Sequence, residues 1–174
     1  MNEPNTFNVQ YRPASANFFS KTGGQFQFAV GSPTWKPPES TDGKSIAWVK
    51  KNGAVFVEAA PPDPSNPGKL DWRNNKVVLA LSDKDIGDLL YAIKKNKPDN
   101  DGVLAKIFHS NEDRSIVKTF RIAKGNGDTY KLSLTLKSPS KSTSVNVYVT
   151  ASDIMRLVTL LQSALPMVLG WDKV

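Results

Sequence analysis

The sequence predicts an α+β protein in which four antiparallel strands followed by one helix occur twice, giving two four-stranded sheets that are each followed by a helix. Short segments alternate apolar with polar residues between Gly, Pro and Asn, as half-buried strands do. Two longer segments repeat apolar residues at helical spacing. KVVLALSDKDIGDLLYAI (76–93) aligns with SVNVYVTASDIMRLVTLL (144–161) at a constant offset of 68 residues. This order of elements predicts an internal ββββα repeat.

The first repeat begins with GGQFQFAV at 23–30, in which Phe26 and Phe28 alternate with glutamine. SIAWVKKNGAVFVEAA at 45–60 predicts two strands around an Asn-Gly turn, a strong hairpin signal. KVVLAL at 76–81 is the fourth predicted strand, and SPTWKPP and PPDPSNPG read as loops because proline removes a ladder donor. A helix follows, capped by Ser82 or Asp83 and ended by Pro98.

The second repeat predicts a strand at 102–110, a hairpin at 115–138 around Gly125-Asn126-Gly127-Asp128, and a strand at 144–149. The closing helix begins near Thr150 or Ser152 and ends near Pro166. We therefore divide the chain into an N-terminal extension (1–22), a first half (23–98) and a second half (99–170). The two halves are expected to form one domain.

The closing helix is apolar on nearly every side, so it must be buried on more than one side. We expect Leu157, Leu161 and Leu165 to pack inside the chain. Met155 and Leu160, on the flanking face, are predicted to form the interface of a homo-oligomer, a dimer or a tetramer.

The 174-residue sequence contains few of the residue types and none of the motifs that usually form a catalytic site. There is no cysteine, which excludes disulfides, zinc-thiolate sites, iron–sulfur clusters and cysteine nucleophiles. His109 is the only histidine. Gly43-Lys44-Ser45 resembles the end of a phosphate-binding loop, but Pro38 stands where that motif requires glycine. We predict no catalytic residues, no metal, no cofactor and no enzymatic activity.

The chain has no run of 18 apolar residues, and MNEPNTFNVQ has neither the basic nor the apolar region of a signal peptide. These features predict an intracellular protein that is not secreted and has no membrane partner, acting in the cytoplasm, the nucleoid or a viral replication site.

The charge points to a polyanionic ligand. Lys and Arg total 23 against 16 Asp and Glu, a net charge of +7. The surplus is regional, because residues 115–141 contain one acid, Asp128, and six basic residues: Lys118, Arg121, Lys124, Lys131, Lys137 and Lys141.

The predicted strands place some of these cations on a polar face. On 129–137, Lys131, Ser133, Thr135 and Lys137 lie opposite the apolar residues, and Tyr148 lies opposite the valines of its strand. For the strand at 115–123 the sequence leaves open which of the two faces is buried, because Lys118 interrupts the apolar pattern. Cations that follow phosphates and rings that stack on bases are how sheets hold single strands. The predicted nucleic-acid-binding residues are Lys118, Arg121, Lys124, Lys131, Lys137, Tyr148, Trp48 and Lys50.

Two ββββα units with a basic outer sheet resemble the Whirly-type single-stranded DNA-binding proteins and the kinetoplastid mitochondrial guide-RNA-binding proteins of the same fold. One such unit, dimerised, is similar to the transcriptional positive cofactors. The resemblance is carried by element order over 23–170, by the segments 76–93 and 144–161, and by the two hairpins. The Lys-Gly-Lys-Ala-Ala-Leu motif of plant Whirly proteins is absent, and KTFRIAKGNG is the nearest basic strand.

The resemblance implies binding of unpaired DNA or RNA with little sequence preference, in replication, recombination, repair or transcription, without a cofactor. We expect a single-stranded nucleic-acid-binding protein, with DNA as the principal ligand. Two alternatives stay open. One is a structural or assembly protein, for example of a virion, that uses the apolar closing helix as its interface and has a merely solvated basic face. The other is an enzyme that needs only acids and lysines.

Overall fold

The computed structural model describes residues 15–20, 23–31, 34–36, 49–51 and 53–170. The first four-stranded antiparallel sheet has the order β1-β2-β5-β6 and consists of β1 (Ser15–Ser20), β2 (Gly24–Gly31), β5 (Ala54–Ala60) and β6 (Val77–Leu81). The second has the order β10-β9-β8-β7 and consists of β7 (Val103–Ser110), β8 (Val117–Lys124), β9 (Thr129–Lys137) and β10 (Ser142–Thr150). Helix α1 (Asp83–Lys95) follows β6, and α2 (Ala151–Leu169) follows β10. The predicted fold class, ββββα twice, is confirmed.

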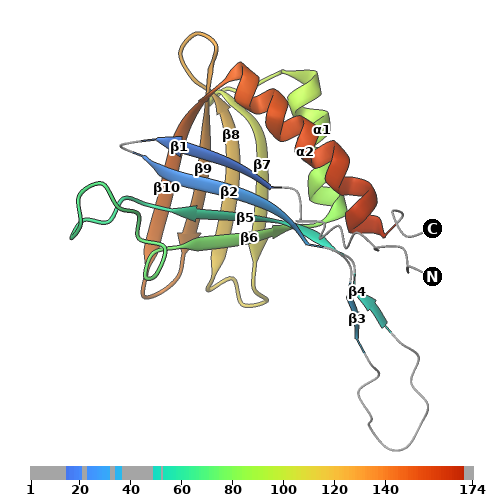
Figure 1. Ribbon diagram of the computed structural model, residues 1–174, viewed down its shortest axis with the longest axis horizontal. Helices are drawn as coiled ribbons and strands as arrows, with labels where there is room; N and C mark the ends of the chain where they lie inside the picture. Colours follow the sequence, from blue (N-terminus) through green and yellow to red (C-terminus); the bar gives the residue numbers. More distant parts are fainter. Residues whose placement is uncertain (1–14, 21–22, 32–33, 37–48, 52, 171–174) are drawn as a thin grey trace, which may run out of the picture.

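The composition of the first sheet differs from the prediction. Its first strand, β1, lies within the segment 1–22 that we had assigned to an extension, and Ala16 and Phe18 point into the core. In the predicted strand at 45–51, the described residues form β4 (Val49–Lys51), which pairs with β3 (Thr34–Lys36) away from the two large sheets (Figure 1). β5 already pairs with β2 on one edge and with β6 on the other, so β4 cannot pair with β5 as the predicted hairpin requires.

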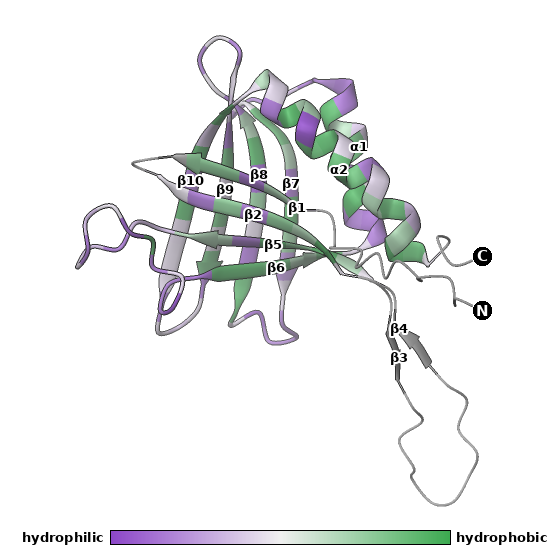
Figure 2. Cartoon of the chain, viewed as in Figure 1, coloured by the Kyte–Doolittle hydropathy of each residue, from purple (hydrophilic) through white to green (hydrophobic). Residues whose placement is uncertain are grey.

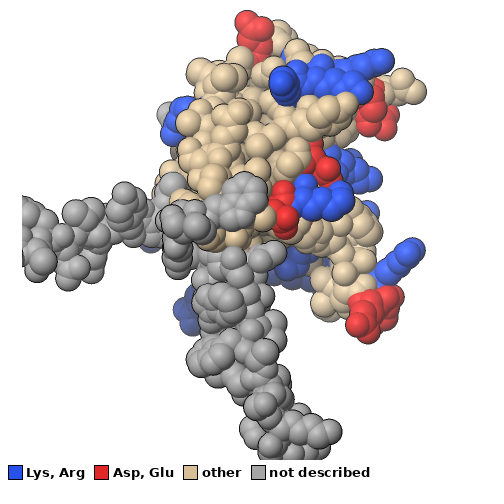
Figure 3. Space-filling view, turned by 90° about the vertical axis from the view of Figure 1, so that its right-hand side faces the viewer, with Lys and Arg blue, Asp and Glu red and all other residues tan. Residues whose placement is uncertain are grey.

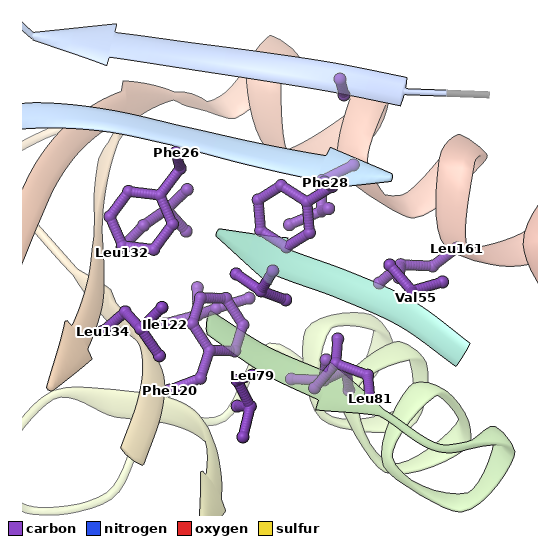
Figure 4. Close-up of a cluster of buried hydrophobic side chains, with 14 of the residues drawn as sticks. Phe26, Phe28, Val55, Leu79, Leu81, Phe120, Ile122, Leu132, Leu134 and Leu161 are labelled. Carbon is purple, nitrogen blue, oxygen red and sulfur yellow. The ribbon is translucent and has the colours of Figure 1, made fainter. Parts of the chain in front are cut away.

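The two sheets lie face to face with their strands crossing (Figure 1), and the core fills the space between them. Phe26 and Phe28 of β2 meet Phe120 of β8, with ring centroids 6.2 and 5.8 Å apart (Figure 4). Leu132 and Leu134 of β9 are fully buried in the same cluster. Apolar and polar residues alternate along the strands (Figure 2), so each strand keeps one face for this core and one for solvent.

Both helices begin with the same device, a capping box. Ser82 and Asp85 cap α1 reciprocally, and Thr150 and Asp153 cap α2 in the same way. These pairs lie 68 residues apart, so the alignment of Asp85 with Asp153 reflects two equivalent helix starts. Asn96 ends α1 in the left-handed conformation, at a φ of 47°.

Helix α2 packs against β1, β2, β5, β9 and β10. Leu157 and Leu161 are fully buried, as expected, and Leu165 is half-buried. By length and composition α2 could cross a membrane, and 33% of its apolar window is buried inside the chain. Leu160 was predicted to face another subunit, and that prediction is wrong: its side chain is 8% exposed, because it packs inside the chain. Met155 is 62% exposed.

Replacing Leu161 with Ala is expected to lower the free energy of unfolding by about 2–5 kcal/mol, because it leaves a cavity where the helix meets both sheets. Met155→Ala on the same helix, which removes an exposed side chain, should change it by no more than about 0.5 kcal/mol. Denaturant titrations of both variants measure the difference, and equal losses would contradict the assignment of the buried face.

Acid is expected to weaken the start of α2. The backbone N–H of Thr150 donates to Asp153, which lowers the pKa of that carboxyl below its ordinary 3.8, with the Thr150 hydroxyl and Arg156 acting in the same direction. A carboxyl whose pKa is lower in the folded chain stabilises it above the ordinary pKa, and loses that effect as pH falls through the folded value.

Asp153→Asn, which cannot ionise, should therefore remove part of the loss of stability below about pH 4. Unfolding free energies measured from pH 5 to pH 2 test this. The same acid dependence in the variant and the parent would contradict it.

Candidate nucleic-acid interface

The outward side of β7–β10 forms a polar, basic surface, which we call the basic face. Burial of Phe120, Ile122, Leu132 and Leu134 turns the alternate residues of β8 and β9 outward. The face is hollowed, with a volume of about 430 Å³. This hollow is lined by Lys106, Phe108, Val117, Thr119, Arg121, Lys131, Ser133, Thr135, Lys137, Ser144 and Asn146.

Strand register sets these side chains in rows across the sheet. One row runs Lys106, Arg121, Ser133, Asn146, and the next runs Phe108, Thr119, Thr135, Ser144. Lys131 opposes Tyr148 at one end of the face, and Val117 opposes Lys137 at the other. The two lysines are six positions apart on β9, or roughly 20 Å at the usual rise of a strand. The cations are therefore spread along the length of the strands.

The middle of the face is polar and internally hydrogen-bonded. The Ser133 hydroxyl donates to Oδ1 of Asn146 at 2.8 Å, and the hydroxyls of Thr135 and Ser144 lie 3.2 Å apart. The Asn146 amide nitrogen keeps its two donors for a ligand. The centre of the face thus offers neutral hydrogen-bonding groups between charged ends.

The cations of this face are unpaired. The ion pairs among the described residues are Lys76–Glu58, Lys84–Asp88, His109–Asp85 and Arg156–Asp153. None of them involves Lys106, Arg121, Lys131 or Lys137, and no Asp or Glu lines the hollow. Four positive charges without internal partners leave the face open to a polyanion.

An exposed aromatic ring stands beside these charges. Tyr148 is 61% exposed, and Nζ of Lys131 lies 6.0 Å from the centre of its ring. Phe108, in the hollow, is 53% exposed. Rings held open to solvent on a basic sheet can stack with unpaired bases.

The remaining predicted residues do not join this surface. Lys118 and Lys124 share the inward side of β8 with Phe120 and Ile122, so they do not lie on the basic face with Arg121. Lys118 lines a separate hollow. Lys124 lies at the end of the strand, where its Nζ donates to the Tyr130 hydroxyl at 3.0 Å. Trp48 lies outside the described residues, and Lys50 lies in β4 with its side chain undescribed.

Sequence reasoning missed Lys106, Phe108 and Asn146. A β-bulge between Val103 and Ala105 buries both Leu104 and Ala105, which breaks simple alternation at the start of β7. From Ala105 onward the alternation is regular, and it places Lys106 and Phe108 outward. Reading alternation from the end of that strand would have found them.

The outward side of the first sheet has a different character. It exposes Phe19 and Phe56 among glutamine and alanine residues, and the ion pair Lys76–Glu58 adds no net charge there.

From the side of the helices (Figure 3), charged side chains border a broad area without Lys, Arg, Asp or Glu. Among the described residues, no three His, Asp or Glu side chains gather as metal ligands would.

Comparison with solved structures shows the same fold in plant proteins. WHY3 and WHY1 from Arabidopsis thaliana are each 17% identical to this chain, with TM-scores of 0.68 and 0.69, over 92% of this chain and 90% and 88% of theirs. The plant transcriptional regulator PBF-2 is 18% identical, with a TM-score of 0.69, over 92% of this chain and 85% of its own. The chain thus has the Whirly fold, as the sequence resemblance predicted.

No protein-family model matches the sequence. No curated protein matches it either.

Proposed function

We propose that the protein binds single-stranded nucleic acid, principally DNA, on the basic face, with little dependence on base sequence and without catalysis. The observation that carries the proposal is the set of four unpaired cations spread along β7–β9 beside the exposed ring of Tyr148. The fold shared with a plant transcriptional regulator supports a role in transcription. Replication, recombination and repair use the same ligand and belong to the proposal.

Single strands suit this face better than duplexes. Phosphates can pair with cations at the two ends of the hollow, but the exposed rings of Tyr148 and Phe108 can stack only with bases that are not already stacked in a helix. Neutral hydroxyls and amides between the cations add hydrogen bonds that fit many bases. This composition favours affinity over sequence selection.

A homo-oligomer belongs to the proposal, with Met155 in the contact and Leu160 no longer part of it. Met155 lies between two hollows. One is shared with Tyr91 and Val158 of the two helices, and the other with Ser15 and Thr159 beside β1. Light scattering of the purified protein tests this, and a clean monomer at micromolar concentration would contradict it.

Changing Arg121, Lys131 and Lys137 together to Ala should weaken binding of a single strand and reduce the slope of log K against log salt by about 2, at about 0.7 for each lost phosphate contact. The melting temperature should stay close to that of the parent, because none of the three side chains is in an ion pair. Fluorescence titration with oligothymidine at several salt concentrations measures the affinity and the salt slope, and thermal unfolding measures the melting temperature.

The matched control removes three exposed lysines away from the face, Lys69, Lys95 and Lys97, with the same change in net charge. It should leave most of the affinity and the slope intact. Equal weakening in both triple variants would mean that net charge acts without a specific face, and parental binding by the first would disprove the site. A parent that binds duplex as tightly as single strands would contradict the preference for unpaired bases.

Tyr148→Ala should cost about 1–3 kcal/mol of binding free energy if a base stacks on the ring, and Tyr148→Phe should keep most of the affinity. The salt slope should be nearly unchanged in both variants, because a ring contact releases no counterions. Equal affinities for Tyr148→Ala and the parent would remove Tyr148 from the binding site.

A further inference from the structure

One pair of basic side chains is not used by the basic face. His109 of β7 and Lys118 of β8 are cross-strand partners, and both turn to the inward side of the second sheet. They line a hollow of about 320 Å³ together with Leu79, Ala80, Asn111 and Ile116. The lysine that interrupts the apolar pattern of 115–123 therefore faces an open space at the end of the core.

The imidazole of His109 is held in place. Its Nε2 lies 3.1 Å from Oδ2 of Asp85, and the same oxygen accepts the backbone N–H and the hydroxyl of Ser82 at 2.8 and 2.7 Å. Burial raises the pKa of Asp85, but the hydrogen bonds from Ser82 and the neighbouring His109 outweigh it and lower that pKa. The carboxylate is thus satisfied by the capping box at the start of α1. Because Nε2 of His109 donates to Asp85, Nδ1 is the nitrogen left for a ligand, as an acceptor in the neutral imidazole and as a donor in the imidazolium.

Lys118 is half-buried and has no internal counter-charge. None of the side-chain hydrogen bonds or ion pairs found among the described residues involves its ammonium group, and no carboxylate lines the hollow. A partly buried ammonium group without a partner favours an anion beside it. An ammonium group beside an imidazole on the neighbouring strand suits a phosphate: the ammonium donates to its oxygens, and the imidazole nitrogen accepts the proton of a monoanionic phosphate or donates when protonated.

The other residues that line the hollow are Ser110 and Asn111, which are polar, and three apolar residues. Leu79, Ala80 and Ile116 supply hydrocarbon walls, and β6 is the last strand of its sheet, so its outward N–H groups do not pair with another strand of that sheet. The volume is at the lower end of the range of small-molecule sites. An anion with an attached flat, apolar group fits these walls better than a bare ion.

We propose that this hollow binds a phosphomonoester on a nucleoside: either a free mononucleotide or the phosphorylated terminal nucleotide of a single strand. The phosphate lies against Lys118 and His109, and the base lies against Ile116 and Leu79. Binding of a strand end rests on the proposed function. The two sites are neighbours, because Ser110 lines this hollow and its cross-strand partner Val117 lines the basic face. A strand that leaves the basic face beyond Lys137 can turn into the hollow there.

The single histidine gives a direct readout, because one pair of imidazole proton resonances reports on the hollow. Thymidine 5′-monophosphate should shift these resonances in a saturable manner, inorganic phosphate should do so more weakly, and thymidine should not. Lys118→Met keeps the aliphatic stem and should weaken the mononucleotide roughly 10- to 100-fold, the loss of one charge-assisted hydrogen bond. Lys97→Met is the matched control and should bind like the parent.

The source of the phosphate is decided with decathymidylate strands carrying a 5′-phosphate, a 3′-phosphate or neither. Tighter binding of one phosphorylated strand, abolished by Lys118→Met but not by Lys97→Met, assigns the hollow to that end of a strand. A His109 shift with the mononucleotide but equal affinities for all three strands assigns it to a free nucleotide. No His109 shift with any phosphate, and no effect of Lys118→Met on end preference, would overturn the proposal.

These results are separable from the test of the basic face. Unphosphorylated decathymidylate should bind Lys118→Met as it binds the parent, with an unchanged salt slope. Weaker binding of unphosphorylated decathymidylate by the Arg121, Lys131 and Lys137 triple variant concerns the basic face alone. The mononucleotide should still shift the His109 resonances in that variant.

Discussion

The packing of the two sheets through Phe26, Phe28 and Phe120 is the constraint on which the rest of the structure depends. Because each sheet gives one face to this contact, its strands alternate between core and solvent over most of their length. The outward faces take no part in that packing and are free to vary. Helices α1 and α2 close one side of the same core, each started by a capping box.

The outward faces of the two sheets carry different kinds of residue. The second sheet carries outward cations without acidic partners, whereas the first carries amides, alanines and two exposed phenylalanines. A repeat of one architecture has thus produced one face suited to phosphates and one that is nearly neutral. Unpaired cations on a surface repel each other and contribute nothing to folding, so a polyanionic ligand is the simplest reason for their clustering.

Strong periodicity made both helices, their caps and the outward placement of Lys131, Lys137 and Tyr148 predictable from sequence, whereas the outward side of the strand that carries Arg121 was left open. The first strand was not, because SANFFS at 15–20 is short and holds only two inward apolar residues, Ala16 and Phe18. The bulge in β7 hid Lys106, and no pattern within β8 alone could show that Lys118 and Lys124 share the inward side. Leu160 was misplaced because an apolar helix does not show which of its sides the sheets cover; α2 touches strands of both.

The measurement that tests the central claim most directly is photochemical cross-linking of a single strand containing 5-iodouracil, followed by identification of the modified peptides. Aromatic side chains in contact with the base take up the label. The account predicts adducts at Tyr148 and Phe108, from β10 and β7, and their loss at high salt. Adducts at Phe19 or Phe56, on the outward side of the first sheet, with none at Tyr148 or Phe108, would contradict it.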